Sequence, residues 1–227
     1  MIKFTRSISA IITALCLTAI YFPNLATGEE KQAPIQKDTA GQWTPLFNGK
    51  DLTGWKNPYK HGTAVVVDGE IHLTANRKFF LTTEKTYSDF ELKVEIQLPE
   101  VGPANSGVML RCHVQPNKVF GYQAECDPTK RAWTGRIYDE GRRKWKLFEK
   151  AQKVETSKVQ APLGKWIKYR ILAVGDHLQV WVDGALTTDL RDAEDASGHI
   201  GIQHHGEKGK TYRFRNISIR EIKAAAK

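Results

Sequence analysis

Acidic and amide side chains alternate with apolar ones along residues 121–127, which read Gly-Tyr-Gln-Ala-Glu-Cys-Asp. In a β-strand, successive side chains point to opposite faces, so this pattern predicts that Gln123, Glu125 and Asp127 share one face. Consecutive residues on one face lie about 6.5–7 Å apart at their Cα atoms. Two carboxyl groups so arranged could divide the acid and base roles of glycoside hydrolysis.

Residues 105–113 and 199–206 alternate in the same way. If these stretches are neighbouring strands of one sheet, their polar faces form one concave site that offers donors, acceptors, a base and a cation. The residues expected in this site are Asn105, Arg111, Gln123, Glu125, Asp127, Tyr138, Gln203 and His205. The simpler alternative is that Arg111 only neutralises Glu125 in an ion pair on a solvated sheet face.

The same face offers a candidate metal site. Glu125, Asp127 and His205 supply oxygen and nitrogen ligands, a mixture that Ca²⁺, Mn²⁺ or Zn²⁺ accepts. No tight ligand motif accompanies them, so a divalent metal stays an alternative and no cofactor is certain. His204 has the core parity of its strand and is expected to be packed or hydrogen-bonded.

Short strands separated by turn signals must position these residues. Strands are expected at residues 64–67, 70–74, 79–82, 89–98, 106–114, 120–127, 135–138, 166–174, 177–182, 199–204 and 212–222. A slip in parity between Phe214 and Ile217 predicts a bulge. The charged segment 139–160 is most simply a solvated loop or hairpin. The pattern predicts a single all-β domain, a two-sheet antiparallel β-sandwich or jelly roll.

The N-terminus has the order of a secretory signal. Lys3 and Arg6 precede an apolar run over residues 8–22, and small residues follow near Gly28. We predict a signal peptide over 1–28, a polar tether over 29–42 and the folded domain over 43–223, with a secreted or periplasmic location. A transmembrane anchor is the alternative, but the run is shorter than the roughly 20 residues that a spanning helix needs.

The formal net charge is +9 at pH 7, and removal of the signal takes two positive charges away. A basic surface suits an anionic polysaccharide or an envelope surface, or is simply a basic soluble surface. No aromatic-and-basic nucleic-acid module is recognisable, so we expect a carbohydrate partner and no nucleic acid. Cys112 and Cys126 could form a disulfide in an oxidising compartment, but two buried thiols are favoured.

The opening segment 46–55, Leu-Phe-Asn-Gly-Lys-Asp-Leu-Thr-Gly-Trp, resembles the entry signature of the 3-keto-disaccharide hydrolase domain family. The further segments that are similar to this family are Asn105-Ser106-Gly107 with Arg111, residues 122–127, Gly135 with Tyr138, residues 201–206 and residues 214–217. The resemblance covers nearly all of 43–222. It implies a concanavalin-like sandwich and cleavage of glycosides already oxidised to a ketone at C3.

The implied chemistry is specific. A C3 ketone acidifies the C2 proton, so a base can remove it, the C1 substituent can leave, and water can add to the enone. This needs a positioned base and a cation or metal at the enolate oxygen. The resemblance then implies His205 or Glu125 as the base, Arg111 as the enolate-stabilising group, Asp127 as an orienting or metal-holding group, and Asn105, Gln123, Tyr138 and Gln203 as sugar-binding residues. The family often has Tyr-Glu followed by Gln on this strand, whereas residues 122–125 read Tyr-Gln-Ala-Glu.

Two other functions fit the sequence. A lectin-like carbohydrate-binding module would use aromatic rings such as Trp55, Trp133 and Trp145, whose simpler role is core packing. An ordinary glycoside hydrolase would act through Glu125 and Asp127. Product analysis separates keto-sugar cleavage, ordinary glycoside cleavage, and binding without a product.

Overall fold

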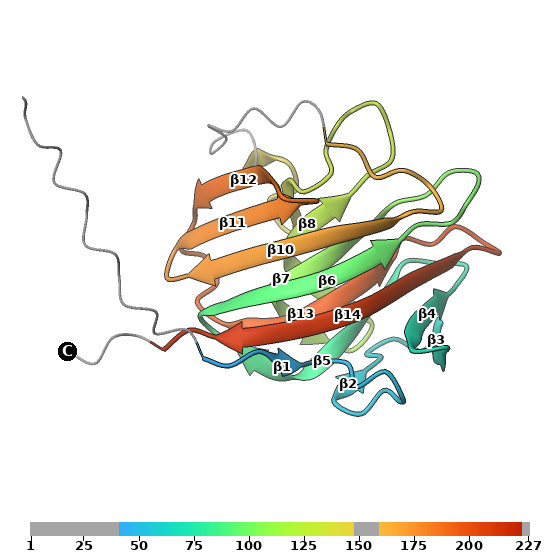
Figure 1. Ribbon diagram of the computed structural model, residues 1–227, viewed down its shortest axis with the longest axis horizontal. Helices are drawn as coiled ribbons and strands as arrows, with labels where there is room; N and C mark the ends of the chain where they lie inside the picture. The colour runs from blue at the N-terminus through green and yellow to red at the C-terminus, as the bar shows by residue number, and fades with distance from the viewer. Residues whose placement is uncertain (1–40, 148–158, 224–227) are drawn as a thin grey trace, which may run out of the picture. The chain divides into compact units, whose positions relative to one another are not determined.

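The computed structural model describes residues 41–147 and 159–223, which form two antiparallel β-sheets packed face to face (Figure 1). The predicted all-β sandwich is therefore confirmed. The predicted signal peptide and nearly all of the predicted tether lie outside the described residues. No helix within the described ranges has the length and apolar character that crossing a membrane requires.

The eight-stranded sheet has the order β12-β11-β10-β6-β14-β4-β3, and β1 pairs with β14. Its strands are β1 (Thr44–Pro45), β3 (Thr63–Val67), β4 (Glu70–Thr74), β6 (Phe90–Gln97), β10 (Trp166–Val174), β11 (His177–Val182), β12 (Ala185–Arg191) and β14 (Thr211–Glu221). The strand β12 was not expected from the sequence, because its residues are largely polar and alternate poorly.

The six-stranded sheet has the order β2-β5-β13-β7-β8-β9 and lies behind the first sheet in Figure 1. Its strands are β2 (Trp55–Lys56), β5 (Phe79–Tyr87), β7 (Ser106–Gln115), β8 (Lys118–Cys126), β9 (Ile137–Glu140) and β13 (Gly198–His204). The three stretches with polar alternation are thus neighbours in one sheet, as the sequence predicted: β13 pairs with β7, and β7 pairs with β8.

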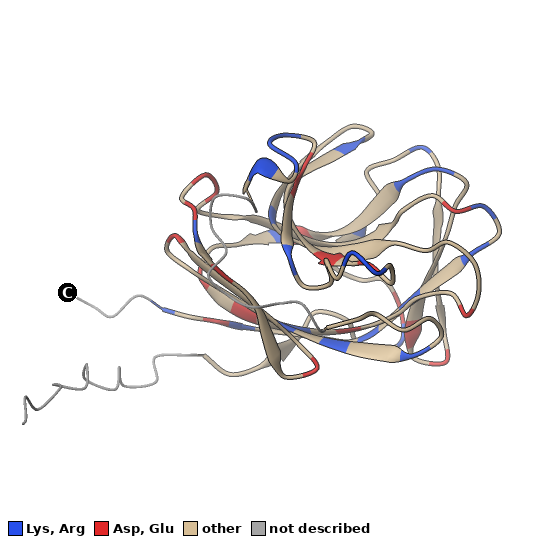
Figure 2. Ribbon diagram, turned by 90° about the horizontal axis from the view of Figure 1, so that it is seen from above, with Lys and Arg blue, Asp and Glu red and all other residues tan. Residues whose placement is uncertain are grey.

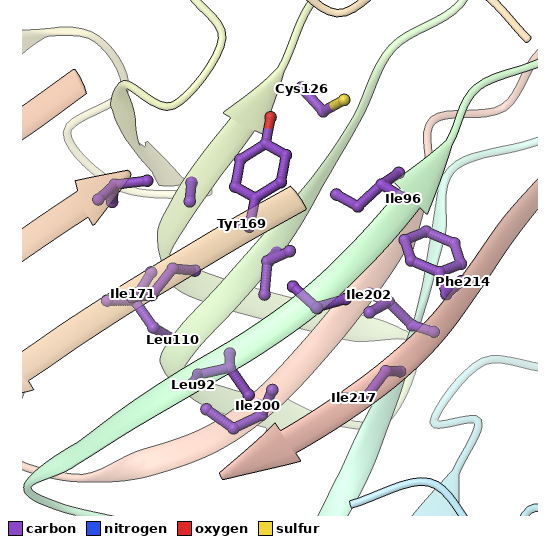
Figure 3. Close-up of a cluster of buried hydrophobic side chains, with 14 of the residues drawn as sticks. Leu92, Ile96, Leu110, Cys126, Tyr169, Ile171, Ile200, Ile202, Phe214 and Ile217 are labelled. Carbon is purple, nitrogen blue, oxygen red and sulfur yellow. The ribbon is translucent and has the colours of Figure 1, made fainter. Parts of the chain in front are cut away.

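The core lies between the sheets and is built from the apolar parity of each strand. Leu92 and Ile96 of β6 meet Ile200 and Ile202 of β13 there (Figure 3), and all four are fully buried. Full burial of one such side chain contributes about 1.5–3 kcal/mol. The strands that supply these residues are therefore held by their apolar faces, which leaves positions on the other face for polar groups.

A β-bulge interrupts β7 at Arg111. Its φ is +48°, and the pairing of β7 with β8 shifts register between Leu110 and His113. Strict alternation along β7 would place Cys112 in the core between the sheets, but it does not lie there. The extra residue turns Cys112 to the outer face of the sheet, where it joins a small apolar cluster of Phe80, Met109, Cys112 and Val119. The bulge predicted in β14 is confirmed at Asn216, whose φ is +52°.

The two cysteines sit in different clusters. Cys126 belongs to the core between the sheets, whereas Cys112 lies in the outer cluster, and both are buried free thiols. They form no disulfide. Lys and Arg are interleaved with Asp and Glu around both sheets (Figure 2).

Candidate active site on the six-stranded sheet

A polar pocket of about 180 Å³ opens on the face of the six-stranded sheet that is turned away from the core. Its lining residues are Lys78, Asn105, Gln123, Glu125, Arg131, Tyr138, Glu140, Trp145, Gln203 and His205. Six of the eight residues predicted from the sequence meet here. The two exceptions are Asp127 and Arg111.

Strand register explains the convergence. On β8, Gln123 pairs with Tyr138 of β9, and on the other side Glu125 pairs with Gly107 of β7. Paired residues share a face, so the polar parities of the strands coincide. Gly107 leaves the necessary room, because a Cβ on it would lie 2.7 Å from the side chain of Gln123.

Glu125 forms the floor of the pocket and is only 5% exposed. Asn105 Nδ2 donates to its Oε1 at 2.5 Å, and Gln123 Nε2 donates to its Oε2 at 2.9 Å. Burial raises the pKa of Glu125 to about 7, and the charge of Asp127 adds to this rise, while the two amide hydrogen bonds oppose it. A carboxyl group with such a pKa exchanges a proton near neutral pH, as a general acid or base must.

The amide of Gln123, which binds the carboxyl group of Glu125, is itself held by the amide of Gln203. Gln123 and Gln203 exchange hydrogen bonds of 3.3 and 3.1 Å between their side chains. The backbone carbonyl of Gln203 accepts a hydrogen bond of 2.8 Å from Ser106 Oγ. The amides thus link β8 to β13 across β7, which keeps Glu125 in one orientation.

His205 stands on the rim, immediately after β13. Its Nδ1 bonds to Glu207 Oε1 at 2.8 Å, and this bond raises the pKa of His205 despite the opposing effect of burial. The charge of Glu125 raises it further, whereas Lys78 lowers it. Glu125 and His205 therefore interact electrostatically in the same pocket, each with a pKa above its ordinary value.

Prediction from the sequence missed three charged residues that line the pocket, Lys78, Arg131 and Glu140. Lys78 Nζ donates to Glu140 Oε1 at 2.6 Å, and Arg131 pairs with Asp127 at 2.8 Å. Glu140 could have been found, because it follows Tyr138 at the same strand parity. Lys78 precedes β5 and carries no such signal, since only the pairing of distant strands brings it to the pocket.

Asp127 does not reach the pocket. Its Oδ1 accepts a hydrogen bond of 2.9 Å from the backbone N of Thr129, and its Oδ2 binds Arg131. The carboxylate therefore shapes the loop after β8 and acts on Glu125 only through its charge. Within 41–147 and 159–223, no three His, Cys, Asp or Glu residues are close enough to hold a metal ion, so the candidate ligands Glu125, Asp127 and His205 do not form such a group.

The predicted place of Arg111 in the pocket is wrong. Its side chain is fully buried, donates to the backbone oxygens of Ser88, Gly175 and Asp195 at 2.7, 2.7 and 3.1 Å, and pairs with Asp89 at 2.9 Å. The bulge at this residue breaks the alternation on which the prediction relied. Arg111 is a structural group that ties β7 to neighbouring turns, and it cannot stabilise an enolate in the pocket.

The described part of segment 139–160 is anchored, not merely solvated. Arg142 pairs with Asp139 at 2.9 Å and with Asp195 at 2.5 Å, and Arg143 pairs with Asp192 at 2.8 Å. These contacts hold the residues after β9 against the sheet. Residues 148–158 lie outside the described part of the chain.

The aromatic rings of Tyr138 and Trp145 line one wall of the pocket, and Trp133 packs against Trp145. Trp145 lies 4.6 Å from Tyr138 and 4.1 Å from Trp133 between ring centroids, and Arg131 lies over Trp133. All three rings are partly exposed. Trp55 is instead 6% exposed and donates to the backbone oxygen of Leu46 at 2.7 Å, so it is a packing residue.

His204 is packed as expected. It is fully buried, its Nδ1 accepts from Gly206 N at 3.0 Å, and its Nε2 bonds to Lys210 O at 3.1 Å. His113, on β7, bonds to Asp195 at 2.7 Å. Neither lines the pocket.

Solved structures share this sandwich at low sequence identity. A protein of Parabacteroides distasonis, provisionally described as a glycosyl hydrolase, is 20% identical with a TM-score of 0.59, over 81% of this chain and 94% of that one. Carbohydrate-binding module CBM66 of Bacillus subtilis is 18% identical with a TM-score of 0.55, over 74% and 96%. The lumenal domain of VIP36 bound to Ca²⁺ and mannose is 10% identical with a TM-score of 0.53, over 76% and 85%. At these identities the likeness shows the fold alone.

No curated protein matches the chain. The model of one protein family does match it, over residues 42–220, which include both sheets and every lining residue of the pocket. The match agrees with the resemblance seen in the sequence. The chain therefore belongs to the family of 3-keto-alpha-glucoside-1,2-lyase-like domains, and its function is a carbohydrate-related one.

Proposed function

We propose that this protein is an enzyme that cleaves 3-keto-glycosides, with 3-keto-α-glucosides as its first substrate class. The observation that carries the proposal is that Glu125 and His205 line one polar pocket and interact through their charges. Both have a raised pKa, which for Glu125 is about 7. Neutral pH thus allows one of them to be a base while the other is an acid.

Glu125 is proposed as the base. In its carboxylate form it takes the proton from C2, which the neighbouring C3 ketone acidifies. The C2–H electron pair moves into the C2–C3 bond, and negative charge develops on the C3 oxygen. Lys78, which lines the same pocket, is the cation proposed to stabilise this enolate oxygen.

His205 is proposed as the acid. As the enolate collapses, the C1–O bond breaks with formation of a C1=C2 double bond, and the imidazolium gives its proton to the leaving oxygen. The products are an enone and an alcohol. Water then adds across C1=C2, with its proton going to C2 and its oxygen to C1, so the net reaction is hydrolysis.

The amides are proposed to bind substrate. Asn105, Gln123 and Gln203 line the pocket beside the carboxyl group, and Tyr138 lies next to Gln123 on the neighbouring strand β9. The side-chain amides of these residues and the Tyr138 hydroxyl offer the hydrogen-bond donors and acceptors that sugar hydroxyls require. The site would therefore bind a neutral sugar ring through hydrogen bonds.

The test uses a 4-nitrophenyl 3-keto-α-glucoside, its β-anomer and the unoxidised glucoside. We expect nitrophenol release and an enone intermediate from keto-substrates alone, with slower reaction when C2 carries deuterium. Glu125→Gln should lower kcat by about 10²–10⁴-fold, whereas Glu84→Gln, at an exposed position on β5, should not. Equal cleavage of the unoxidised glucoside, or full turnover by Glu125→Gln, would refute the proposal.

A lectin-like role is the second candidate, supported by the aromatic wall of Tyr138 and Trp145, against which Trp133 packs. Aromatic faces contribute to sugar binding without any chemistry. Binding of the keto-sugar by calorimetry, with no product from either anomer, would favour this role over the enzyme.

We also propose that the domain acts outside the cytoplasm, as a secreted or periplasmic protein. The support is the charged, apolar and small-residue order of residues 1–28. Cell fractionation with N-terminal sequencing tests it: mature protein that begins near residue 29 is expected, and full-length protein in the cytoplasm would refute it.

A further inference from the structure

The segment that follows β13 folds back onto the pocket. Gly206 has a φ of +122°, and a Cβ on it would lie 2.8 Å from the backbone N of Lys78. The chain at this point is thus pressed against the start of β5. This conformation places His205 and Glu207, two residues apart, so that their side chains bond to each other.

Glu207 is held from its other side as well. Its Oε1 bonds to His205 Nδ1 at 2.8 Å, and its Oε2 accepts a hydrogen bond of 2.5 Å from the hydroxyl of Tyr212. Tyr212 is fully buried and lies on β14, in the opposite sheet. The carboxylate is therefore fixed by partners on two different elements.

The chain of contacts continues to Glu125. The hydroxyl of Tyr212 also accepts from the backbone N of Asn105 at 3.3 Å, and Asn105 Nδ2 donates to Glu125 Oε1. The contacts run in order from Glu125 to Asn105, Tyr212, Glu207 and His205. One hydrogen-bonded path thus joins the proposed base to the proposed acid.

The charges agree with this geometry. Burial alone would raise the pKa of Glu207, but the hydrogen bonds from His205 and Tyr212 outweigh it and lower the pKa. Glu207 is therefore anionic at neutral pH and favours the imidazolium form of His205. The other charged groups that act on His205 are Glu125, which raises its pKa, and Lys78, which lowers it.

We propose that Glu207, held by Tyr212, is a positioning residue that fixes the orientation and protonation of His205. Its bond to Nδ1 keeps a proton on that nitrogen and leaves Nε2 as the atom that can give a proton to the leaving oxygen. The inference deepens the proposed function and rests on it. Glu207 itself touches no reacting atom and acts only through His205.

The first measurement is independent of activity. The pKa of His205 is followed by NMR on histidine-labelled protein, with its signal assigned by the loss in His205→Gln. In Glu207→Gln the negative charge is removed, so the pKa of His205 should fall. In Glu207→Asp it should stay higher than in Glu207→Gln, because the charge is kept. An unchanged pKa in Glu207→Gln would overturn the inference.

The second measurement is the pH dependence of kcat with a 3-keto-α-glucoside. Because His205 must be protonated to act as the acid, its pKa sets the basic limb of the profile, the pH range in which kcat falls as the pH rises. This limb should move to lower pH in Glu207→Gln. At pH above that limb, kcat should fall by about 10²-fold with little change in KM. Tyr212→Phe should lower kcat without lowering the pKa of His205, since Glu207 then keeps its full charge. A Glu207→Gln variant with the wild-type profile would overturn the inference.

The two measurements distinguish a failure of the proposed function from a failure of the positioning role of Glu207. If the wild-type protein turns over no keto-glycoside but Glu207→Gln still lowers the pKa of His205, the proposed function fails and the positioning stands. If turnover is present and the His205 pKa is unmoved, the positioning fails alone. Glu84→Gln is the control for an exposed charge, and urea unfolding of every variant shows that it is folded.

Discussion

The hydroxyl of Tyr169 crosses the core between the two sheets and donates a 2.7 Å hydrogen bond to the backbone carbonyl of Glu125. Tyr169 lies on β10 in the eight-stranded sheet and is fully enclosed by the core (Figure 3). The same carbonyl accepts from Gly135 N at 2.8 Å. The position of Glu125 on the outer face is thus fixed by a contact on the inner face.

Tyr169→Phe removes this hydroxyl while keeping the ring. We expect a loss of about 1 kcal/mol in the free energy of unfolding, because one buried hydrogen bond disappears and the carbonyl keeps only one partner. Urea unfolding measures it. The exposed change Thr44→Val on β1 is the control. A Tyr169→Phe variant as stable as the wild type would contradict the role given to this bond.

The raised pKa of Glu125 makes stability depend on pH. Folding raises the pKa from 4.5 to about 7, so the folded state binds this proton more tightly than the unfolded state. The wild type should therefore lose stability as the pH rises from about 4.5 to about 7, by up to about 3 kcal/mol. Glu125→Gln lacks this dependence. Urea unfolding of both proteins at pH 5 and pH 8 checks it, and parallel curves would exclude the shift.

Arg111 should matter for stability and not for chemistry. Arg111→Met removes the donors to three backbone carbonyls and the cation that pairs with Asp89, which keeps its hydrogen bond from Gly175 N, so we expect a loss of about 3 kcal/mol or more. Arg191→Met is the matched control, because Arg191 is 66% exposed in its pair with Asp176 and should cost about 0–1 kcal/mol. Turnover per folded molecule should be preserved in Arg111→Met. A fall in kcat with unchanged stability would contradict this and show that Arg111 contributes to catalysis.

Gly107 should be required for the shape of the pocket. In Gly107→Ala the new Cβ would lie 2.7 Å from Gln123 and 2.8 Å from the backbone oxygen of Ala124, so Gln123 must move. We expect a loss of about 1–3 kcal/mol in stability and weaker sugar binding. Gly201→Ala is the control, because its nearest atoms, in Met109, lie 3.2 Å away. Equal effects of the two changes on sugar affinity, measured by calorimetry, would contradict this.

Lys78 should stabilise the enolate. Lys78→Met removes the cation and should lower kcat/KM for a 3-keto-α-glucoside by about 10²–10³-fold. Lys78→Arg keeps the charge and should retain part of the activity. Lys85→Met, at an exposed position on β5, is the control. Full turnover by Lys78→Met would assign the enolate to another group.

The alternation of polar and apolar residues determined much of this protein. It predicted the sandwich and placed Gln123, Glu125, Tyr138 and Gln203 on one face, because side-chain direction in a strand is a local property with a period of two. It failed at Arg111, where a single residue with positive φ breaks the period.

The tertiary structure decided what the sequence pattern could not. Lys78 meets Glu140, 62 residues away, only because β5 and β9 belong to one sheet. Glu207 meets Tyr212 through the fold of the chain after β13. The pKa of Glu125 depends on burial, which is set by all the strands around it. Spacing along a strand fixes the face that a residue occupies, but its neighbours and its solvation depend on how distant strands pair.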